Sequence, residues 1–432
     1  AARPVPSGPS AVLFIGDGMG PAYVTATRVA RGGSRGRLHL DDLPRTALVR
    51  TYSADSPVTD SAAAASAMAC GRKTVNGVLC EDATALNGRR DGARLESIAV
   101  WAKRQGMRVA LVTTARITHA TPAAFYAVDD DRDHERAIAR AAIASSFDLL
   151  LGGGRQFFLP GPPVPDDHGW QASDREDLEA TARARGVRVV VSAVELREVT
   201  SISRTRVIGL FADSHLPYEA ELTGVTGIGG RAASATTGAG VAAAPGLVEM
   251  TRRAIDLLKG TGQPFFLMVE GGRIDHAGHD NWVRTLIDET AAFDAAVGVA
   301  VAALDPKSTL VLVTADHETG GLAINGYPDG KDGLFSTYDP GEEGAPYPVL
   351  SFASGPGSGG PPDPAAPHGS EDPRPSTFRL KSAAHTGVDV ALYGWGAGSE
   401  RVHGTLENTA VYQILKEHLE KKGPAGTQRP RR

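Results

Sequence analysis

The side chains best suited to chemistry are carboxylates that stand beside histidines. Asp275 and His279 are four residues apart, a spacing that places both on one side of a helical turn. Asp316 and His317 are adjacent and directly follow an apolar run, 310–315. Carboxylate and imidazole together suit a divalent transition metal such as zinc. Either pair alone would more often be a surface or capping feature, so the number of such segments matters.

Two further segments add candidates. Asp17 lies in the segment 16–20 (Gly-Asp-Gly-Met-Gly), directly after the apolar run 11–15. This is not the glycine spacing of a dinucleotide-binding loop, and an aspartate there would repel a pyrophosphate unless a metal stood between them. The alternative is a tight turn with a solvated aspartate. His385 stands just before the apolar run 388–393. Taken together, the segments predict a multi-metal site.

Ser61 is the candidate nucleophile. It follows Asp60 at the start of an alanine-rich segment that predicts a helix. A serine at a helix start lies in a positive field that favours an anionic group. No histidine is placed as its base in a Gly-x-Ser-x-Gly elbow, so activation would have to come from a metal. The alternative is an ordinary N-cap before a buried helix.

Arg132 could grip two oxygens of a phosphate through its planar guanidinium. It lies in the acidic run 129–133, where the alternative is an exposed arginine. Cys70 and Cys80 are close enough in sequence to close a short loop, as in exported proteins. The alternative is that Cys70 is a buried free thiol. The sequence leaves both alternatives open for the cysteines.

These side chains need a scaffold, and apolar runs of strand length alternate with amphipathic stretches along most of the chain. The alternation predicts an α/β fold: a three-layer sandwich with a mostly parallel central sheet flanked by helices. Ligands in such folds bind beyond the carboxyl ends of the strands. The predicted strands are 11–15, 108–112, 149–151, 187–191, 207–211, 264–269, 310–314 and 388–393, and the predicted helices are 95–105, 136–146, 175–185, 247–258, 282–303 and 405–419.

One catalytic domain is predicted over residues 10–420. Gly, Pro, Ser and Asp crowd the segment 329–375, which predicts a surface insertion or lid, and 421–432 predicts a flexible tail. With 45 basic and 50 acidic residues, the formal charge of −5 gives no reason to expect nucleic acid as a partner. No apolar run reaches the roughly 20 residues that span a bilayer, and no signal peptide is present. The start, 1–6, fits either a product of signal cleavage or an arbitrary boundary.

Five motifs then occur in one order: Gly-Asp-Gly-Met-Gly, Thr-Asp-Ser-Ala, Val-Glu-Gly-Gly-Arg-Ile-Asp-His, Thr-Ala-Asp-His and His-Thr-Gly. The chain therefore strongly resembles the alkaline phosphatases. The resemblance implies hydrolysis of phosphate monoesters through a phosphoserine on Ser61, with a broad substrate range, an alkaline optimum and inhibition by the phosphate released. It also implies a secreted or periplasmic enzyme, commonly a homodimer.

The resemblance further implies three metals. The first zinc would stabilise the leaving group and activate the water that hydrolyses the phosphoserine, the second would hold the serine oxygen, and the third metal is usually magnesium. The implied ligands are Asp275, His279 and His385 for the first zinc; Asp17, Asp316 and His317 for the second; and Asp17, Thr121 and Glu270 for the third metal.

Four residues are implied to bind the substrate: Ser61, Arg132, His119 and His276. Family members vary at the last two, where some carry aspartate and lysine. Two imidazoles near the third site make zinc or cobalt alternatives to magnesium there. Ala212 stands where the calcium site of animal members would need a carboxylate, so no such site is expected.

Competing hydrolases of the same superfamily fit less well. A sulfatase would need a Cys- or Ser-x-Pro-x-Arg segment, which neither Cys70 nor Cys80 begins. A phosphodiesterase would be expected to lack Arg132 and the third-metal set, yet Thr121 and Glu270 are both present. A cofactor-independent phosphoglycerate mutase is a further alternative of this superfamily. If the protein only bound phosphate through metals, an activated Ser61 would be unexplained. Phosphomonoester hydrolysis is therefore the preferred interpretation.

Overall fold

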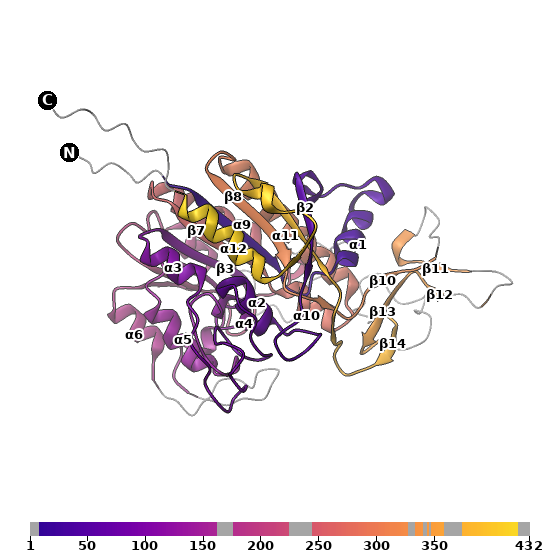
Figure 1. The fold of residues 1–432 in the computed structure, drawn as a ribbon, viewed down its shortest axis with the longest axis horizontal. Helices are drawn as coiled ribbons and strands as arrows, with labels where there is room; N and C mark the ends of the chain where they lie inside the picture. Colours follow the sequence, from indigo (N-terminus) through magenta and orange to yellow (C-terminus); the bar gives the residue numbers. More distant parts are fainter. Residues whose placement is uncertain are drawn as a thin grey trace.

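A computed structural model describes residues 8–161, 176–223, 244–326, 333–339, 344, 347–357 and 374–421. Its middle layer is a ten-stranded sheet (Figure 1). In order across the sheet, the strands are β17 (Thr405–Glu407), β2 (Arg45–Arg50), β16 (Val390–Gly396), β8 (Thr309–Ala315), β1 (Ser10–Gly16), β7 (Phe265–Gly271), β3 (Arg108–Arg116), β4 (Leu149–Gly153), β6 (Val207–Leu210) and β5 (Arg188–Val190).

Neighbouring strands in this sheet run parallel except at β16, which is antiparallel to both β2 and β8. β1 lies between β8 and β7, and every residue of these three strands is buried. Unbroken apolar strands of this kind are covered by side chains on both faces. All eight predicted strands lie in this sheet, which confirms the α/β fold and the mostly parallel sheet.

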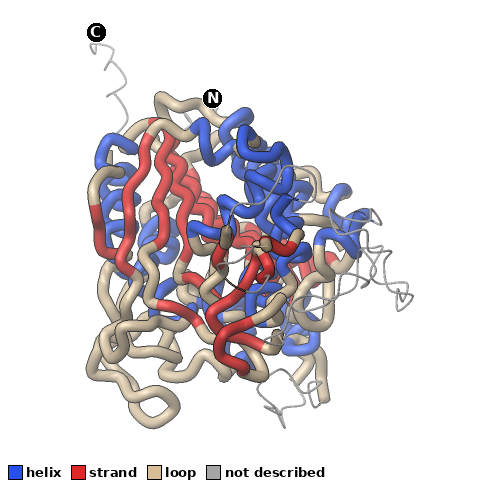
Figure 2. The backbone as a smooth tube through the Cα atoms, turned by 90° about the vertical axis from the view of Figure 1, so that its right-hand side faces the viewer, coloured by secondary structure: helices blue, strands red, loops and turns tan. Residues whose placement is uncertain are grey.

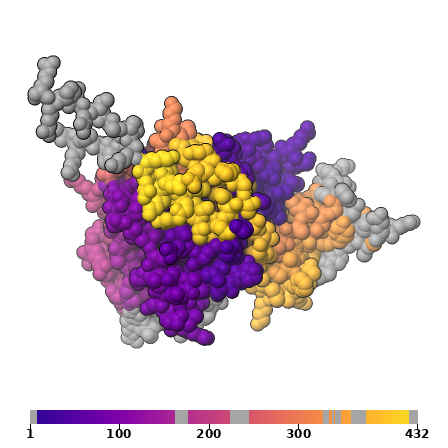
Figure 3. All heavy atoms as spheres, viewed as in Figure 1, coloured from indigo at the N-terminus to yellow at the C-terminus, as the bar shows by residue number. Residues whose placement is uncertain are grey.

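Helices cover both faces of the sheet (Figures 1 and 2). The helices of one layer pack against the long α11, and those of the other against α2 and α12. The first layer contains α1 (Pro21–Gly32), α9 (Leu247–Gly260), α10 (Arg273–His279) and α11 (Val283–Ala303); the second contains α2 (Ser61–Cys70), α3 (Ile98–Arg104), α4 (Ala120–Ala123) and α12 (Thr409–Glu420). In the space-filling view, α12 (yellow) covers the surface beside segments from the N-terminal quarter of the chain (Figure 3).

Four more helices are α5 (Glu135–Ala144), α6 (Leu178–Ala184), α7 (Ala193–Arg197) and α8 (Glu219–Thr223). Shorter strands lie outside the main sheet. They are β10 (Ala323–Ile324), β13 (Leu350–Gly355) and β14 (Ser376–Arg379) in one small sheet, β11 (Thr337–Tyr338) with β12 (Tyr347–Pro348), and β9 (Glu318–Thr319) with β15 (His385–Thr386).

The predicted insertion, 329–375, lies partly outside the described residues, and its described parts contain β11, β12 and β13, in the part of the chain that projects to one side in Figure 1. Its role as a lid stays a prediction. The tail also lies outside the described residues beyond position 421, and no helix within the described part of the chain could cross a membrane.

Two strands of the main sheet, β17 and β2, were not predicted. The predicted helix 405–419 begins with a strand, because residues 405–407 pair in parallel with the end of β2, and α12 starts only at Thr409. β2 itself was not predicted, since its alternating buried and exposed residues give no apolar run. Strands near the edge of the sheet, such as β17 and β2, are stabilised by pairing that a local pattern does not reveal.

Cys70 ends α2, and Cys80 lies in the loop that follows. Both thiols are buried and free, and their Sγ atoms are 2.8 Å apart. The chain therefore brings the pair together, and the disulfide and the buried free thiol stay the two alternatives of the sequence analysis.

Candidate metal and phosphate site

The strand ends with the candidate ligands meet at one edge of the sheet. Asp17 directly follows β1, Glu270 is the penultimate residue of β7, and Asp316 directly follows β8. Gly16, the last residue of β1, lies opposite the last residues of both β7 and β8. The three carboxylates are therefore neighbours, and all three are buried.

The first group contains Asp275 and His279, one turn apart on α10, and His385 on β15. Their ligand atoms lie within 4.8 Å of one another. Nε2 of His279 is 3.1 Å from Oδ2 of Asp275 and 3.2 Å from Nε2 of His385. The Nδ1 atoms of the two histidines donate to the carbonyl oxygens of Ala383 and Thr59, at 2.6 and 3.0 Å. Each Nδ1 therefore carries a proton, which leaves Nε2 as the atom that can bind a metal.

The second group contains Asp17, Asp316 and His317. Nε2 of His317 is 3.5 Å from Oδ1 of Asp17 and 3.3 Å from Oδ2 of Asp316. The Oγ atom of Ser61 is 3.2 Å from the same Nε2. Ser61 is the first residue of α2, whose N-cap is Asp60, so the hydroxyl lies at the positive end of the helix. The predicted nucleophile and the predicted ligands are thus in contact.

The third group contains Asp17, Glu270 and His119, again with ligand atoms within 4.8 Å of one another. Glu270 accepts a hydrogen bond from Thr113, and Thr121 of α4 lies beside the same carboxylate. Asp17 belongs to both the second and the third group. Asp17 would therefore be a shared ligand if both groups held a cation.

Several buried oxygens of these groups have no hydrogen-bond partner among the described residues. A buried carboxylate without a partner is costly, and in proteins such groups are normally paired or bound to a metal. The donor set is oxygen and imidazole, which suits zinc and magnesium. The residues present therefore fit divalent metals. The unpartnered atoms are both carboxylate oxygens of Asp17, Oδ2 of Asp316, Oε1 of Glu270 and Oγ1 of Thr121.

The electrostatics of the buried carboxylates agree with a cation site. Burial raises the pKa of Asp17 well above its usual range, and it raises the pKa values of Glu270 and Asp316 to about 7. Asp275 differs: burial opposes its ionisation most strongly, but His279, His385 and His317 together outweigh burial and hold the pKa of that carboxyl well below normal. Burial opposes protonation of His279, but Asp275 raises the pKa of that imidazole to about 9.

Arg132 is held beside the groups by two contacts. One terminal nitrogen donates to Oδ2 of Asp60 at 3.0 Å, and the other lies 3.0 Å from Nε2 of His119. His276 lies farther along, its ring centroid 5.8 Å from that of His119 and 4.1 Å from that of His215. His276 is thus placed next to His119, but it belongs to none of the three groups.

Three residues of the site were not predicted: Thr113 against Glu270, His215 against His276, and Thr319, whose hydroxyl contacts Asp275. A lone threonine or histidine has no diagnostic spacing, and only the fold brings it to the ligands. For Thr319 the one available clue was its position three residues after Asp316.

Comparison with known proteins gives a consistent result. The family model described as alkaline phosphatase matches residues 10–421. The membrane-bound alkaline phosphatase of Bombyx mori is 32% identical over 451 residues, covering 93% of this chain and 78% of that protein. The crystal structure of Thermus thermophilus alkaline phosphatase has a TM-score of 0.70 at 26% identity, covering 97% of this chain and 94% of that one. A variant alkaline phosphatase of the Antarctic bacterium TAB5, solved with Mg bound, has a TM-score of 0.69 at 24% identity, covering 96% and 99%.

Proposed function

The chain belongs to the alkaline phosphatase family and hydrolyses phosphate monoesters, and we propose that the reaction runs through a phosphoserine intermediate on Ser61. The observation that carries this proposal is the position of the Ser61 hydroxyl. It lies at the N-terminus of α2, 3.2 Å from Nε2 of His317 in the second group. An anionic phosphoryl group placed there would meet the positive end of the helix on one side and Arg132 on the other.

Metals are part of the proposal. The first and second groups would each hold a zinc ion, which when bound would stabilise the charge on the attacking and leaving oxygens of an in-line displacement. The third group would hold magnesium, since Asp17, Glu270 and Thr121 offer oxygen ligands. The imidazole of His119 in that group favours zinc or cobalt instead. The unpartnered carboxylate oxygens support metal binding at the second and third groups, and the clustering of Asp275, His279 and His385 supports it at the first.

The chain's own residues would then act in two steps. In the first, the Ser61 oxygen forms a bond to phosphorus while the bond from phosphorus to the alcohol breaks. Arg132 binds two oxygens of the phosphoryl group, and Asp60 and His119 fix the orientation of the guanidinium. In the second, water attacks phosphorus on the opposite face and the serine oxygen leaves, which frees inorganic phosphate.

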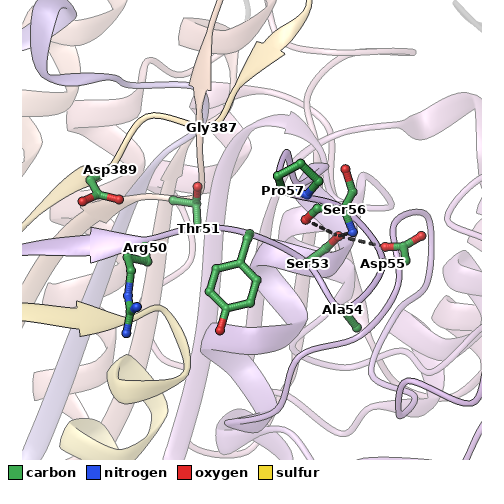
Figure 4. Close-up of a pocket in the computed structure, with 10 residues that line it drawn as sticks. Arg50, Thr51, Ser53, Ala54, Asp55, Ser56, Pro57, Gly387 and Asp389 are labelled. Carbon is green, nitrogen blue, oxygen red and sulfur yellow. Dashed lines mark hydrogen bonds between the residues drawn. The ribbon is translucent and has the colours of Figure 1, made fainter.

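An open cavity adjoins this region and bears on the substrate range. It has a volume of about 540 Å³ and is lined by residues 50–57 together with Gly387 and Asp389 (Figure 4). Its wall includes Gly387, two residues after the first-group ligand His385. It also includes Pro57, two residues before Thr59, whose carbonyl oxygen contacts Nδ1 of His385. We propose that the alcohol part of the substrate faces such open space, so that the site selects mainly the phosphoryl group. A homodimer and a secreted or periplasmic location stay predictions of the family resemblance.

The test is to trap the intermediate. Incubation with a ³²P-labelled monoester, acid quenching and peptide mapping should place the label on Ser61 in the wild type. The Ser61→Ala variant should show no label and little turnover, the remainder arising from direct attack by water. Ser66→Ala is the matched control, because Ser66 is buried on the same helix with its hydroxyl directed to Val78 and Cys80. A label on any other residue would refute the assignment, and a burst of alcohol from an aryl phosphate would exclude a mere binding protein.

A further inference from the structure

Thr319 lies between two of the metal-ligand groups. It is the second residue of β9 and is fully buried. Its Oγ1 atom is 2.5 Å from Oδ1 of Asp275, a member of the first group, and 3.3 Å from Nδ1 of His317, a member of the second. One hydroxyl therefore contacts ligands of both groups.

The hydroxyl has one proton to donate, which fixes the direction of both hydrogen bonds. An ionised carboxylate only accepts, so Thr319 donates to Asp275 and must accept from Nδ1–H of His317. The neutral imidazole of His317 then carries its proton on Nδ1 and its lone pair on Nε2. That Nε2 is the atom that faces Ser61, Asp17 and Asp316. The contact with Thr319 thus selects the tautomer in which His317 can act as a ligand.

Several contacts to the backbone and side chain of Thr319 hold it in place. The Tyr23 hydroxyl donates to the Thr319 carbonyl at 2.5 Å. Thr319 also pairs with His385 across the β9–β15 ladder, so the strand that carries the hydroxyl is tied to the third ligand of the first group. Gly18 packs so closely that a Cβ atom there would lie 2.7 Å from both Oγ1 of Thr319 and Oδ1 of Asp275.

We propose that Thr319 is a positioning residue that couples the two zinc-binding groups, by orienting Asp275 in the first and fixing the tautomer of His317 in the second. The proposal rests on the proposed function, since it requires zinc at both groups. It predicts that loss of this one hydroxyl weakens zinc binding at both groups together, although Thr319 itself is not a ligand.

The experiment compares Thr319→Val, which removes the hydroxyl at nearly constant shape, with Thr319→Ser, which keeps it. Zinc per chain is measured by mass spectrometry after dialysis against graded chelator. Loss of the partner of a ligating histidine typically weakens metal binding 10- to 100-fold. We therefore expect zinc affinity to fall by that factor in Thr319→Val and to stay close to the wild-type value in Thr319→Ser. Nitrogen-15 spectra of the imidazoles should show His317 protonated at Nδ1 in the wild type and in Thr319→Ser. In Thr319→Val the distribution of the proton between Nδ1 and Nε2 should change.

Thr27→Val is the control, because Thr27 is equally buried and its hydroxyl bonds only within α1. If Thr319→Val does not fold, Thr319→Ala replaces it with the same expected zinc loss. Wild-type zinc retention in the Val or Ala variant would overturn the proposal, as would an equal loss in Thr27→Val. A wild-type protein that binds no zinc at all would instead refute the proposed function.

Discussion

Removal of the Arg132 guanidinium tests how the phosphoryl group is held. Arginine has five N–H donors in a planar fork. In the structure one terminal nitrogen donates to Asp60 and the other contacts His119, so two donors are used and three remain free to face a phosphate. The geometry therefore leaves enough donors for a bidentate contact with two oxygens.

The expected magnitude follows from that contact. A hydrogen bond to a charged group contributes about 1.5–3 kcal/mol, which corresponds to a change in affinity between roughly tenfold and 150-fold. Arg132→Ala should raise the inhibition constant of inorganic phosphate by a factor in this range and lower kcat/KM for an aryl phosphate similarly. Arg132→Lys keeps the charge but not the planar fork of donors, so its phosphate inhibition constant should lie between those of the wild type and Arg132→Ala.

The assay measures the phosphate inhibition constant beside metal content, since no proposed ligand is removed. Arg104→Ala is the control, because Arg104 pairs with Glu96 on the surface and should leave the inhibition constant unchanged. An unchanged inhibition constant in Arg132→Ala, with the metals still present, would show that another residue holds the phosphate.

Two further predictions concern the metals. The pKa values of Asp316 and Glu270 are raised to about 7 and that of His279 to about 9, and a ligand must lose its proton to bind, so metal uptake should release more protons at pH 6 than at pH 9. Calorimetric titration in buffers of different ionisation enthalpy measures this release, and none at pH 6 would contradict the reasoning. At the third group, His119→Asp replaces imidazole with a carboxylate and should increase the magnesium kept through dialysis, measured by mass spectrometry. The prediction would be refuted if the wild type already kept one magnesium per chain through dialysis and His119→Asp kept the same amount.

The central sheet could be predicted because its strands are local features. β1, β7 and β8 are continuous apolar runs, and the rule that ligands lie beyond the carboxyl ends then located the acidic residues that follow them. β2 and β17 could not be predicted in this way. Four of the six residues of β2 are exposed and β17 has three residues, so β17 depends on its pairing with β2, and β2 on its pairing with β17 and β16.

The candidate site divides along similar lines. Aspartates and histidines at strand ends are rare enough to stand out in a sequence, and the structure brings those of the first and second groups together. The contacts that orient them were not predictable, because Thr319 is an ordinary threonine until β9 pairs with β15. His276 shows the opposite case: its motif singled it out, yet its closest ring neighbour is His215, which no motif marks.

The carboxylate of Asp60 contacts both the helix that begins with Ser61 and the side chain of Arg132. Its Oδ1 atom accepts from the backbone N–H of Ala63 and so caps α2, which begins with Ser61. Its Oδ2 atom accepts from Arg132 and from the backbone N–H of Gly77, both at 3.0 Å. A hydroxyl at the start of a helix and a cation aimed at the same space are therefore fixed relative to each other by one carboxylate. In the proposed mechanism, the nucleophile Ser61 and the phosphate-binding Arg132 therefore share one carboxylate as an anchor, which orients both side chains before the substrate binds.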